Sequence, residues 1–298
     1  MILVIGGTGF VGSHLLLRMR REGLPVRALV RNPDRALALA DLGVEAVPGG
    51  LSDKASLEKA LTGVERVIHL VGIIQEAPGV TFKGVHVEGT RNLVEAARKG
   101  GVRHFFYQSA LGTRPGAKSE YHKTKWQAEE LVRASGIPYT ILRPSLIYGP
   151  GDQFTIRLAE IIRQSPVLPV IGSGKSKVQP IAIDDVVSCI VKAVSSDAFL
   201  NEIYEIGGPE QLSYEEVTRA IAGAMGVTRT AIHVPMLFMR PMARVLEAVL
   251  PRPPVTTDQL IMLREDNVCS MRDIRDAFGV EPIRFEEGLK KFIKKAAG

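Results

Sequence analysis

The chain opens with Met1-Ile2-Leu3-Val4-Ile5-Gly6-Gly7-Thr8-Gly9-Phe10-Val11-Gly12. An apolar run of strand length ends in glycines at Gly6, Gly9 and Gly12, and an amphipathic helical pattern follows directly. Such a strand must turn sharply into a helix while its backbone passes close to a pyrophosphate, and a Cβ at the glycine positions would block that approach. Phosphates bind the N–H groups at a helix N-terminus, where the helix dipole favours negative charge. The stretch therefore predicts a dinucleotide-binding turn, with a purely structural glycine turn as the alternative.

Strand and helix patterns alternate along the first half of the chain. The apolar strand patterns after the first lie at 26–30, 44–47, 66–71, 103–107 and 139–142, and a further one lies at 202–206. The helical patterns lie at about 12–22, 54–61, 82–99 and 119–130. This alternation predicts an α/β fold with a Rossmann-type, doubly wound parallel sheet.

The second half of the chain is less regular. A helical pattern at 155–163 precedes a Pro/Gly-rich loop at 166–174, and Asp184 or Asp185 is expected to cap a helix that reaches about residue 194. Ser213 and Glu216 are expected to form a capping box that opens a helix to Met225. The remaining residues to Gly298 show helical patterns, broken at 251–254. We predict a dinucleotide-binding domain over 1–150 plus about 178–207. A smaller, mostly helical substrate or partner domain is predicted over about 151–177 plus 208–298.

Composition and charge restrict the classes of partner and the compartment that we expect. The 298 residues carry a net charge of +6, which suits an anionic cofactor, but no basic and aromatic stripe indicates a nucleic-acid partner. We predict no metal site. Cys189 lies within an apolar pattern and is expected to be a reduced core residue. A strand that begins at residue 2 leaves no room for a targeting peptide, and no stretch has the roughly 18 apolar residues of a membrane span. The expected compartment is the cytoplasm, with peripheral membrane association as the alternative.

One segment of the second half is unusually apolar. Residues 232–250 are rich in Met, Phe, Val and Pro, and their basic residues are Arg240 and Arg244. We expect a helix that packs into the second domain, and a membrane- or quinone-facing surface is the alternative.

The end of the second predicted strand bears on the choice of cofactor. In a dinucleotide fold this position meets the adenosine ribose, where a carboxylate favours NAD and a basic residue favours the 2′-phosphate of NADP. Here Val30 is followed by Arg31, and Arg35 lies a short step further on. Both guanidinium groups suit a phosphate, so NADP(H) is favoured over NAD(H). The alternative is that both arginines are solvated surface charges.

A candidate catalytic pair lies on the helix predicted after the fifth strand. Tyr121 and Lys125 are four residues apart and therefore share one helix face. A nearby ammonium stabilises a phenolate, so we expect Lys125 to lower the pKa of Tyr121 and to hold the nicotinamide ribose. His69 lies in an apolar strand and is expected to be a buried, hydrogen-bonded residue.

The chain resembles the extended or atypical branch of the short-chain dehydrogenase/reductase superfamily. The residues that carry the resemblance are Gly6-Gly7-Thr8-Gly9-Phe10-Val11-Gly12, His69-Leu70-Val71-Gly72, Gly89-Thr90-Arg91-Asn92-Leu93, Tyr121 with Lys125, the run from Leu142 to Asp152, and the run from Gln179 to Val186. Together with the glycine turn, the resemblance implies these cofactor-binding residues: Gly6, Thr8, Gly9, Phe10, Val11, Gly12, Arg31, Arg35, Leu51, Leu70, Val71, Gly72, His86, Tyr121, Lys125, Pro144, Ser145 and Leu146. It also implies catalysis by Tyr121, Lys125 and Ser109.

The sequence departs from this branch at three places. Gly50 stands where an aspartate usually precedes the leucine of the adenine loop, His86 falls in the helix motif that usually has an asparagine, and Ala110 follows Ser109 where a Ser or Thr often stands. If Ser109 does not supply the hydroxyl that partners Tyr121, the substrate loses a donor that orients it.

Two functions remain open. One is an NADP(H)-dependent oxidoreductase or epimerase/dehydratase that acts on a small molecule or quinone in the cleft between the domains. The other follows from a resemblance to the group related to an accessory subunit of respiratory complex I. It is an NADPH-binding protein with a structural, assembly or redox-sensing role and a respiratory-complex or peripheral membrane partner.

Overall fold

The computed structural model describes residues 1–251 and 253–293, and these divide into two compact units. The first unit comprises Met1–Arg143 and Val187–Tyr204, and the second comprises Pro144–Val186 and the described residues of 205–298. The boundaries lie near residues 143, 186 and 204, whereas the sequence placed them at about 150, 177 and 207. Consequently Pro144, Ser145 and Leu146 belong to the second unit.

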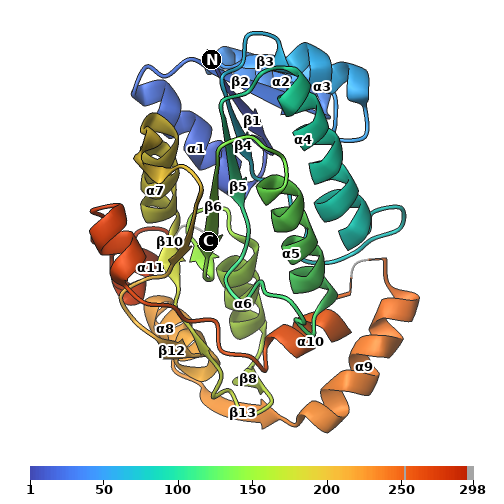
Figure 1. Cartoon of the computed structure of the whole chain (residues 1–298). Coiled ribbons are helices and arrows are strands. Elements are labelled where there is room, and N and C mark those ends of the chain that lie inside the picture. The colour runs from blue at the N-terminus through green and yellow to red at the C-terminus, as the bar shows by residue number, and fades with distance from the viewer. Residues whose placement is uncertain (252, 294–298) are drawn as a thin grey trace. The chain divides into compact units, whose positions relative to one another are not determined.

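A seven-stranded sheet forms the centre of the first unit, in the order β11-β6-β5-β4-β1-β2-β3 (Figure 1). The six strands from β1 to β6 pair in parallel with their neighbours, which confirms the Rossmann-type fold. The strands are β1 (Ile2–Ile5), β2 (Val26–Val30), β3 (Glu45–Pro48), β4 (Arg66–His69), β5 (His104–Gln108), β6 (Tyr139–Pro144) and β11 (Glu202–Ile206). The helices are α1 (Phe10–Arg21), α2 (Pro33–Asp41), α3 (Lys54–Leu61), α4 (Gly89–Lys99), α5 (Glu120–Arg133) and α7 (Ile183–Ser195).

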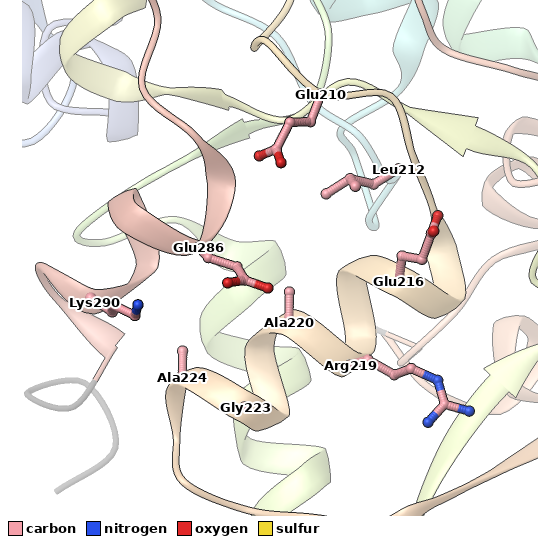
Figure 2. A pocket seen from close by; sticks show the side chains of 9 residues that line it. All are labelled: Glu210, Leu212, Glu216, Arg219, Ala220, Gly223, Ala224, Glu286 and Lys290. Carbon is pink, nitrogen blue, oxygen red and sulfur yellow. The ribbon is translucent and has the colours of Figure 1, made fainter.

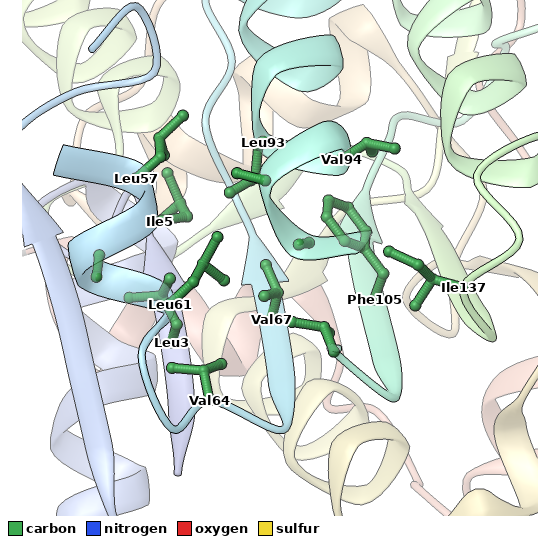
Figure 3. Packing of buried hydrophobic residues seen from close by; sticks show 14 of the residues in the cluster. Leu3, Ile5, Leu57, Leu61, Val64, Val67, Leu93, Val94, Phe105 and Ile137 are labelled. Atoms are coloured by element: carbon green, nitrogen blue, oxygen red, sulfur yellow. The ribbon is translucent and has the colours of Figure 1, made fainter. Parts of the chain in front are cut away.

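One face of this sheet packs on α3, α4 and α5. Figure 3 shows Leu57 and Leu61 of α3 and Leu93 of α4 against strand residues that include Val67 and Phe105. These side chains are buried. Removing their apolar surface from water stabilises the fold by about 25 cal/mol per Å². A parallel sheet is covered on both faces, so its strands appear in the sequence as continuous apolar runs rather than as alternating ones.

Capping residues set several helix boundaries. Asp53 accepts a hydrogen bond from the Ser56 amide, and the reciprocal bonds between Ser213 and Glu216 form the expected capping box. The helix predicted over 82–99 is divided, with a π-helical segment over Lys83–Glu88 before α4. Asp184 and Asp185 do not precede α7, because that helix begins at Ile183 and both lie in its first turn. The prediction of a cap at either position is therefore wrong.

The second unit combines short strand pairs with helices. Its helices are α6 (Gln153–Gln164), α8 (Tyr214–Ala224), α9 (Met236–Val249), α10 (Thr257–Met262) and α11 (Phe285–Lys290), with a π-helical segment over Asp273–Ala277. Its strands are β7 (Ile147–Tyr148), β8 (Val167–Ile171), β9 (Lys177–Val178), β10 (Ile181–Ala182), β12 (Leu212–Ser213) and β13 (Thr230–Val234). β8 pairs in parallel with β13, so the loop predicted over 166–174 is wrong. Its five strand residues are extended by pairing with a segment about 60 residues later, which local composition does not reveal.

Candidate functional site

The glycine turn joins β1 to α1 as predicted. Gly6 has φ +91°, a left-handed conformation that favours glycine. A Cβ on Gly12 would lie 2.1 Å from the Gly6 carbonyl oxygen and 2.6 Å from Gly7 Cα, so only glycine lets the helix approach the turn this closely. No side chain caps the start of α1, whose N-cap is the exposed Gly9. The turn thus leaves backbone N–H groups for an anion and a surface that a phosphate can approach, which fits a dinucleotide.

The two predicted arginines lie beside this turn and beside the loop at Gly50 and Leu51. Arg35 donates from Nη1 to the Thr8 carbonyl oxygen at 2.9 Å. Arg31 is exposed just after β2, and a Cβ built on Gly50 would lie 3.4 Å from its Cγ. Next to Gly50, the Leu51 carbonyl accepts a 2.9 Å hydrogen bond from Asn92 Nδ2, a contact that sequence reasoning missed.

The segment after β4 leads from the glycine turn to Lys125. The Leu70 amide donates to the Ile5 carbonyl, and a Cβ on Gly6 would lie 3.2 Å from Val71 Cγ2. Two residues further on, a Cβ on Gly72 would lie 3.1 Å from Lys125 Nζ. The structure therefore brings the predicted residues at 6, 70–72 and 125 into one continuous strip.

Lys125 is buried at the end of this strip. Its ammonium donates to the Gln108 carbonyl oxygen at 2.9 Å and lies 4.9 Å from the centre of the Tyr107 ring. Burial lowers the pKa of Lys125 to about 8, and the Glu129 carboxylate one turn further along α5 opposes that shift. Lys125 therefore begins to lose its proton slightly above neutral pH.

Tyr121 lies in an aromatic cluster on the same helix. Its ring centre is 6.0 Å from that of Phe82, 5.6 Å from that of His86 and 5.1 Å from that of His122. Burial raises the pKa of Tyr121 to about 12. The expected lowering of the Tyr121 pKa by Lys125 is wrong, because desolvation of the phenol dominates. Tyr121 is accordingly a protonated phenol at neutral pH.

His86 occupies the π-helical segment before α4 and links two parts of the site. Its Nε2 accepts a 3.0 Å hydrogen bond from the Ile73 amide, so its Nδ1 carries the proton and donates to Thr124 Oγ1 at 2.9 Å. Burial and the nearby Lys125 charge lower the pKa of His86 to about 2, so the ring is neutral. Both ring nitrogens have protein partners, and the histidine fixes the loop after Gly72 to α5.

Two buried hydroxyls lie after β5. Ser109, the predicted partner of Tyr121, has its Oγ 3.5 Å from Thr113 Oγ1, a long contact. The Ser109 amide donates to the Leu142 carbonyl at 2.8 Å, which holds the residue against β6. Thr113 was not predicted, and it supplies a second hydroxyl where Ala110 offers none. His69 is fully buried and its Nε2 lies 2.9 Å from Thr90 Oγ1, which confirms the core histidine.

Comparison with known proteins agrees with this geometry. Residues 1–253 match the model of the NmrA-like family. The chain belongs to that family. Its relatives include a ceramide reductase from Caulobacter vibrioides, 34% identical over 235 residues, which cover 78% of this chain and 73% of the relative. The 40 kDa subunit of NADH-ubiquinone oxidoreductase from Neurospora crassa is 26% identical over 285 residues, which cover 94% of this chain and 75% of that subunit.

Solved structures show the same fold. The triphenylmethane reductase of a Citrobacter species, complexed with NADP(H), superposes with a TM-score of 0.78 over all of both chains at 20% identity. The NmrA-like chain thus has the fold of NAD(P)-binding oxidoreductases and epimerases, as the sequence predicted.

Three predicted cofactor residues of the NmrA-like chain lie in its second unit. Ser145 Oγ lies 2.6 Å from Asn267 Oδ1 and accepts a 3.1 Å hydrogen bond from the Gln179 amide. The Leu146 carbonyl accepts from the Ile181 amide. These bonds tie the segment after Pro144 to the predicted Gln179 motif and to the chain near residue 267.

The second unit also contains a cavity of about 550 Å³ between α8 and α11. Figure 2 shows carboxylates of Glu210 and Glu286 approaching it from two sides. Its lining residues are Glu210, Leu212, Glu216, Arg219, Ala220, Gly223, Ala224, Glu286 and Lys290. None of them is a predicted site residue.

Proposed function

We propose that the protein is an NADP(H)-dependent oxidoreductase in which Tyr121 transfers a proton and Lys125 holds the nicotinamide ribose. The observation that carries this proposal is the continuous strip from the glycine turn through Val71 and Gly72 to the buried ammonium of Lys125. A turn with backbone N–H groups for the pyrophosphate and an ammonium for the nicotinamide ribose match two neighbouring polar groups of an extended dinucleotide.

The bound cofactor supplies or accepts the hydride. Tyr121, protonated at neutral pH, donates its phenolic proton to a carbonyl oxygen that becomes a hydroxyl. Lys125 stabilises the phenolate that this transfer leaves, and solvent replaces the proton. Ser109 and Thr113 offer hydroxyl groups that orient the reacting oxygen. A phenol that is protonated before the reaction favours the reductive direction.

A carbonyl or hydroxyl group on an amphiphilic, lipid-like molecule is the substrate class that we propose. The relationship to a ceramide reductase supports a reductase over an epimerase. Turnover of NADPH with a panel of long-chain keto lipids, quinones, aldehydes and nucleotide sugars tests this. Normal NADPH binding with no turnover on any of them would refute the catalytic proposal.

Arg31 is expected to select the phosphorylated cofactor. In Arg31→Asp the attraction for a 2′-phosphate becomes repulsion, and we expect the Kd for NADPH to rise by about 100-fold while that for NADH changes less than about threefold. Nucleotide fluorescence titration measures both. Arg21→Asp, an exposed charge on α1, serves as the control for a general loss of positive charge. Equal losses for both nucleotides in Arg31→Asp would contradict the assignment.

The pH profile should report Lys125. Below a pH of about 8 the ammonium is present, so kcat/KM for NADPH-dependent reduction should be level, and above it should fall about tenfold per pH unit. His86 is neutral throughout this range and adds no inflection. The fall in kcat/KM above pH 8 does not come from unfolding. The folded pKa of Lys125 is about 8 and its ordinary pKa is 10.5, so burying the charged ammonium destabilises the fold below pH 8. This penalty decreases between pH 8 and 10.5, so the fold becomes more stable over the range in which activity falls. A kcat/KM that rises across pH 8–9 would contradict the role of Lys125.

A second function has its own support. The relationship to the complex I 40 kDa subunit covers 94% of the chain, and Ala110 replaces a hydroxyl residue often found in catalytic relatives. In this alternative NADPH is held as a structural or redox-sensing group within a respiratory assembly. Rapid cofactor exchange coupled to steady NADPH oxidation would exclude it. NADPH that co-purifies and survives dialysis without turnover would favour it.

A further inference from the structure

Helix α9 of the second unit has two apolar sides. Met239 and Ala243 are buried against Leu260, and Ile171 and Val234 pack beside them. This side anchors the helix to its own unit and confirms in part the expected packing of residues 232–250.

The other side of α9 is apolar and open. Its large side chains Leu237, Phe238, Met242, Val245 and Val249 are 44–77% exposed. Four of them, from Phe238 onward, follow the spacing i, i+4, i+7, i+11, which places them on one stripe of a helix. Ile232 of β13 and Leu250 add exposed apolar side chains just before and after the helix. A contiguous patch of this kind marks an interaction site rather than ordinary surface.

Two charges on the exposed surface of α9, outside the stripe, indicate what the helix contacts. Arg240 and Arg244 are one turn apart and exposed, and neither makes an ion pair within residues 1–251 and 253–293. The only carboxylate in the α9 sequence is Glu247, which accepts hydrogen bonds from the Thr257 amide and hydroxyl. Glu247 is thus engaged within its own unit, and α9 itself offers no other acidic group to pair the arginines of a second copy. An anionic surface satisfies both arginines.

We propose that α9 lies in the plane of a membrane surface that carries anionic lipids. The apolar stripe enters the boundary between headgroups and acyl chains, and Arg240 and Arg244 pair with lipid phosphates. The helix has 14 residues and is about 21 Å long, shorter than the hydrocarbon core of roughly 30 Å. No helix in residues 1–251 and 253–293 combines the length and the hydropathy of a membrane span. The inference is independent of the proposed chemistry at Tyr121.

Vesicle flotation with the full chain tests the proposal. Wild-type protein should float with vesicles of equal parts phosphatidylcholine and phosphatidylglycerol, and more weakly with phosphatidylcholine alone. Leu237→Ser combined with Phe238→Ser should lower the vesicle-bound to free ratio by about tenfold or more, since two exposed apolar anchors are lost. Arg240→Glu combined with Arg244→Glu should remove the preference for the anionic vesicles.

The substitutions are placed at exposed positions so that the variants keep the wild-type fold. All four positions are exposed, so circular dichroism and melting should not change. Leu37→Ser alters a 70%-exposed leucine on α2 and should bind vesicles like the wild type. Wild-type protein that floats with neither vesicle, or a Leu237/Phe238 variant that floats as well as the wild type, would overturn the proposal. A wild-type dimer in sedimentation that the same variant converts to a monomer, with no vesicle binding, would also overturn it in favour of self-association.

Discussion

Replacing Tyr121 by phenylalanine should lower kcat by about 1,000-fold and change the Kd for NADPH by less than about threefold. The reason is that the variant removes only the phenolic hydroxyl, whose proton the proposed reaction needs. A phenylalanine keeps the ring contacts with Phe82, His86 and His122, so the aromatic cluster and the nearby strip from Gly6 to Lys125 are preserved. Steady-state turnover with saturating NADPH and fluorescence titration of the nucleotide separate the two effects.

A second tyrosine provides a matched control. Tyr214 of the second unit is half-buried, as Tyr121 is. Burial raises the pKa of Tyr214 to about 12, the same value as for Tyr121. Tyr214→Phe therefore removes a phenol of similar acidity that has no proposed role, and its kcat should equal that of the wild type. Retention of more than about one tenth of the wild-type kcat by Tyr121→Phe would argue that another group supplies the proton.

The fold of the first unit could be predicted because its signals are local. A glycine turn, apolar strand runs and amphipathic helices each report their own segment, and the parallel pairing follows from their alternation. Helix α3 matches its predicted range of 54–61 because Asp53 caps it and Thr62 follows. Cys189 is fully buried in α7, as its apolar surroundings indicated.

The second unit was harder to predict because its structure depends on distant partners. β8 and β13 are extended through pairing with each other, and proline and glycine around β8 indicate a loop when read alone. Only Met239 and Ala243 of α9 are buried, although most residues of the helix are apolar. An apolar pattern shows which residues avoid water but not which of them the same chain covers.

In the candidate site, the sequence predicted which residues lie together better than it predicted their pKa values. Spacing placed Tyr121 and Lys125 on one helix face, but their pKa values depend on burial by segments far away in sequence. Lys125 donates to a backbone carbonyl, that of Gln108, which leaves no signature in a side-chain pattern. Thr124 and Thr113 were missed for a similar reason, because a threonine that binds a histidine or serine does not differ in sequence from one in solvent.

Arg143→Met should destabilise the first unit by about 3–5 kcal/mol, because it leaves a buried carboxylate without its main partner. The Glu129 side chain is 0% exposed, and Arg143 binds it through Nε at 2.9 Å and Nη2 at 2.6 Å. Arg133 Nη1 lies 4.0 Å from Glu129 Oε2 and cannot replace this two-point contact. Urea denaturation followed by circular dichroism measures the loss in the free energy of unfolding.

A double variant separates the stranded charge from simple loss of packing. Combining Glu129→Leu with Arg143→Met replaces the ion pair by apolar groups of similar length, and stability should return to within about 1 kcal/mol of the wild type. If the double variant is as unstable as Arg143→Met alone, the packing of the Arg143 side chain beside Trp126 matters more than the ion pair. The same double variant also removes the carboxylate that opposes the lowering of the Lys125 pKa. Its kcat/KM should therefore begin to fall at a lower pH than that of the wild type, which links this buried pair to the proposed site.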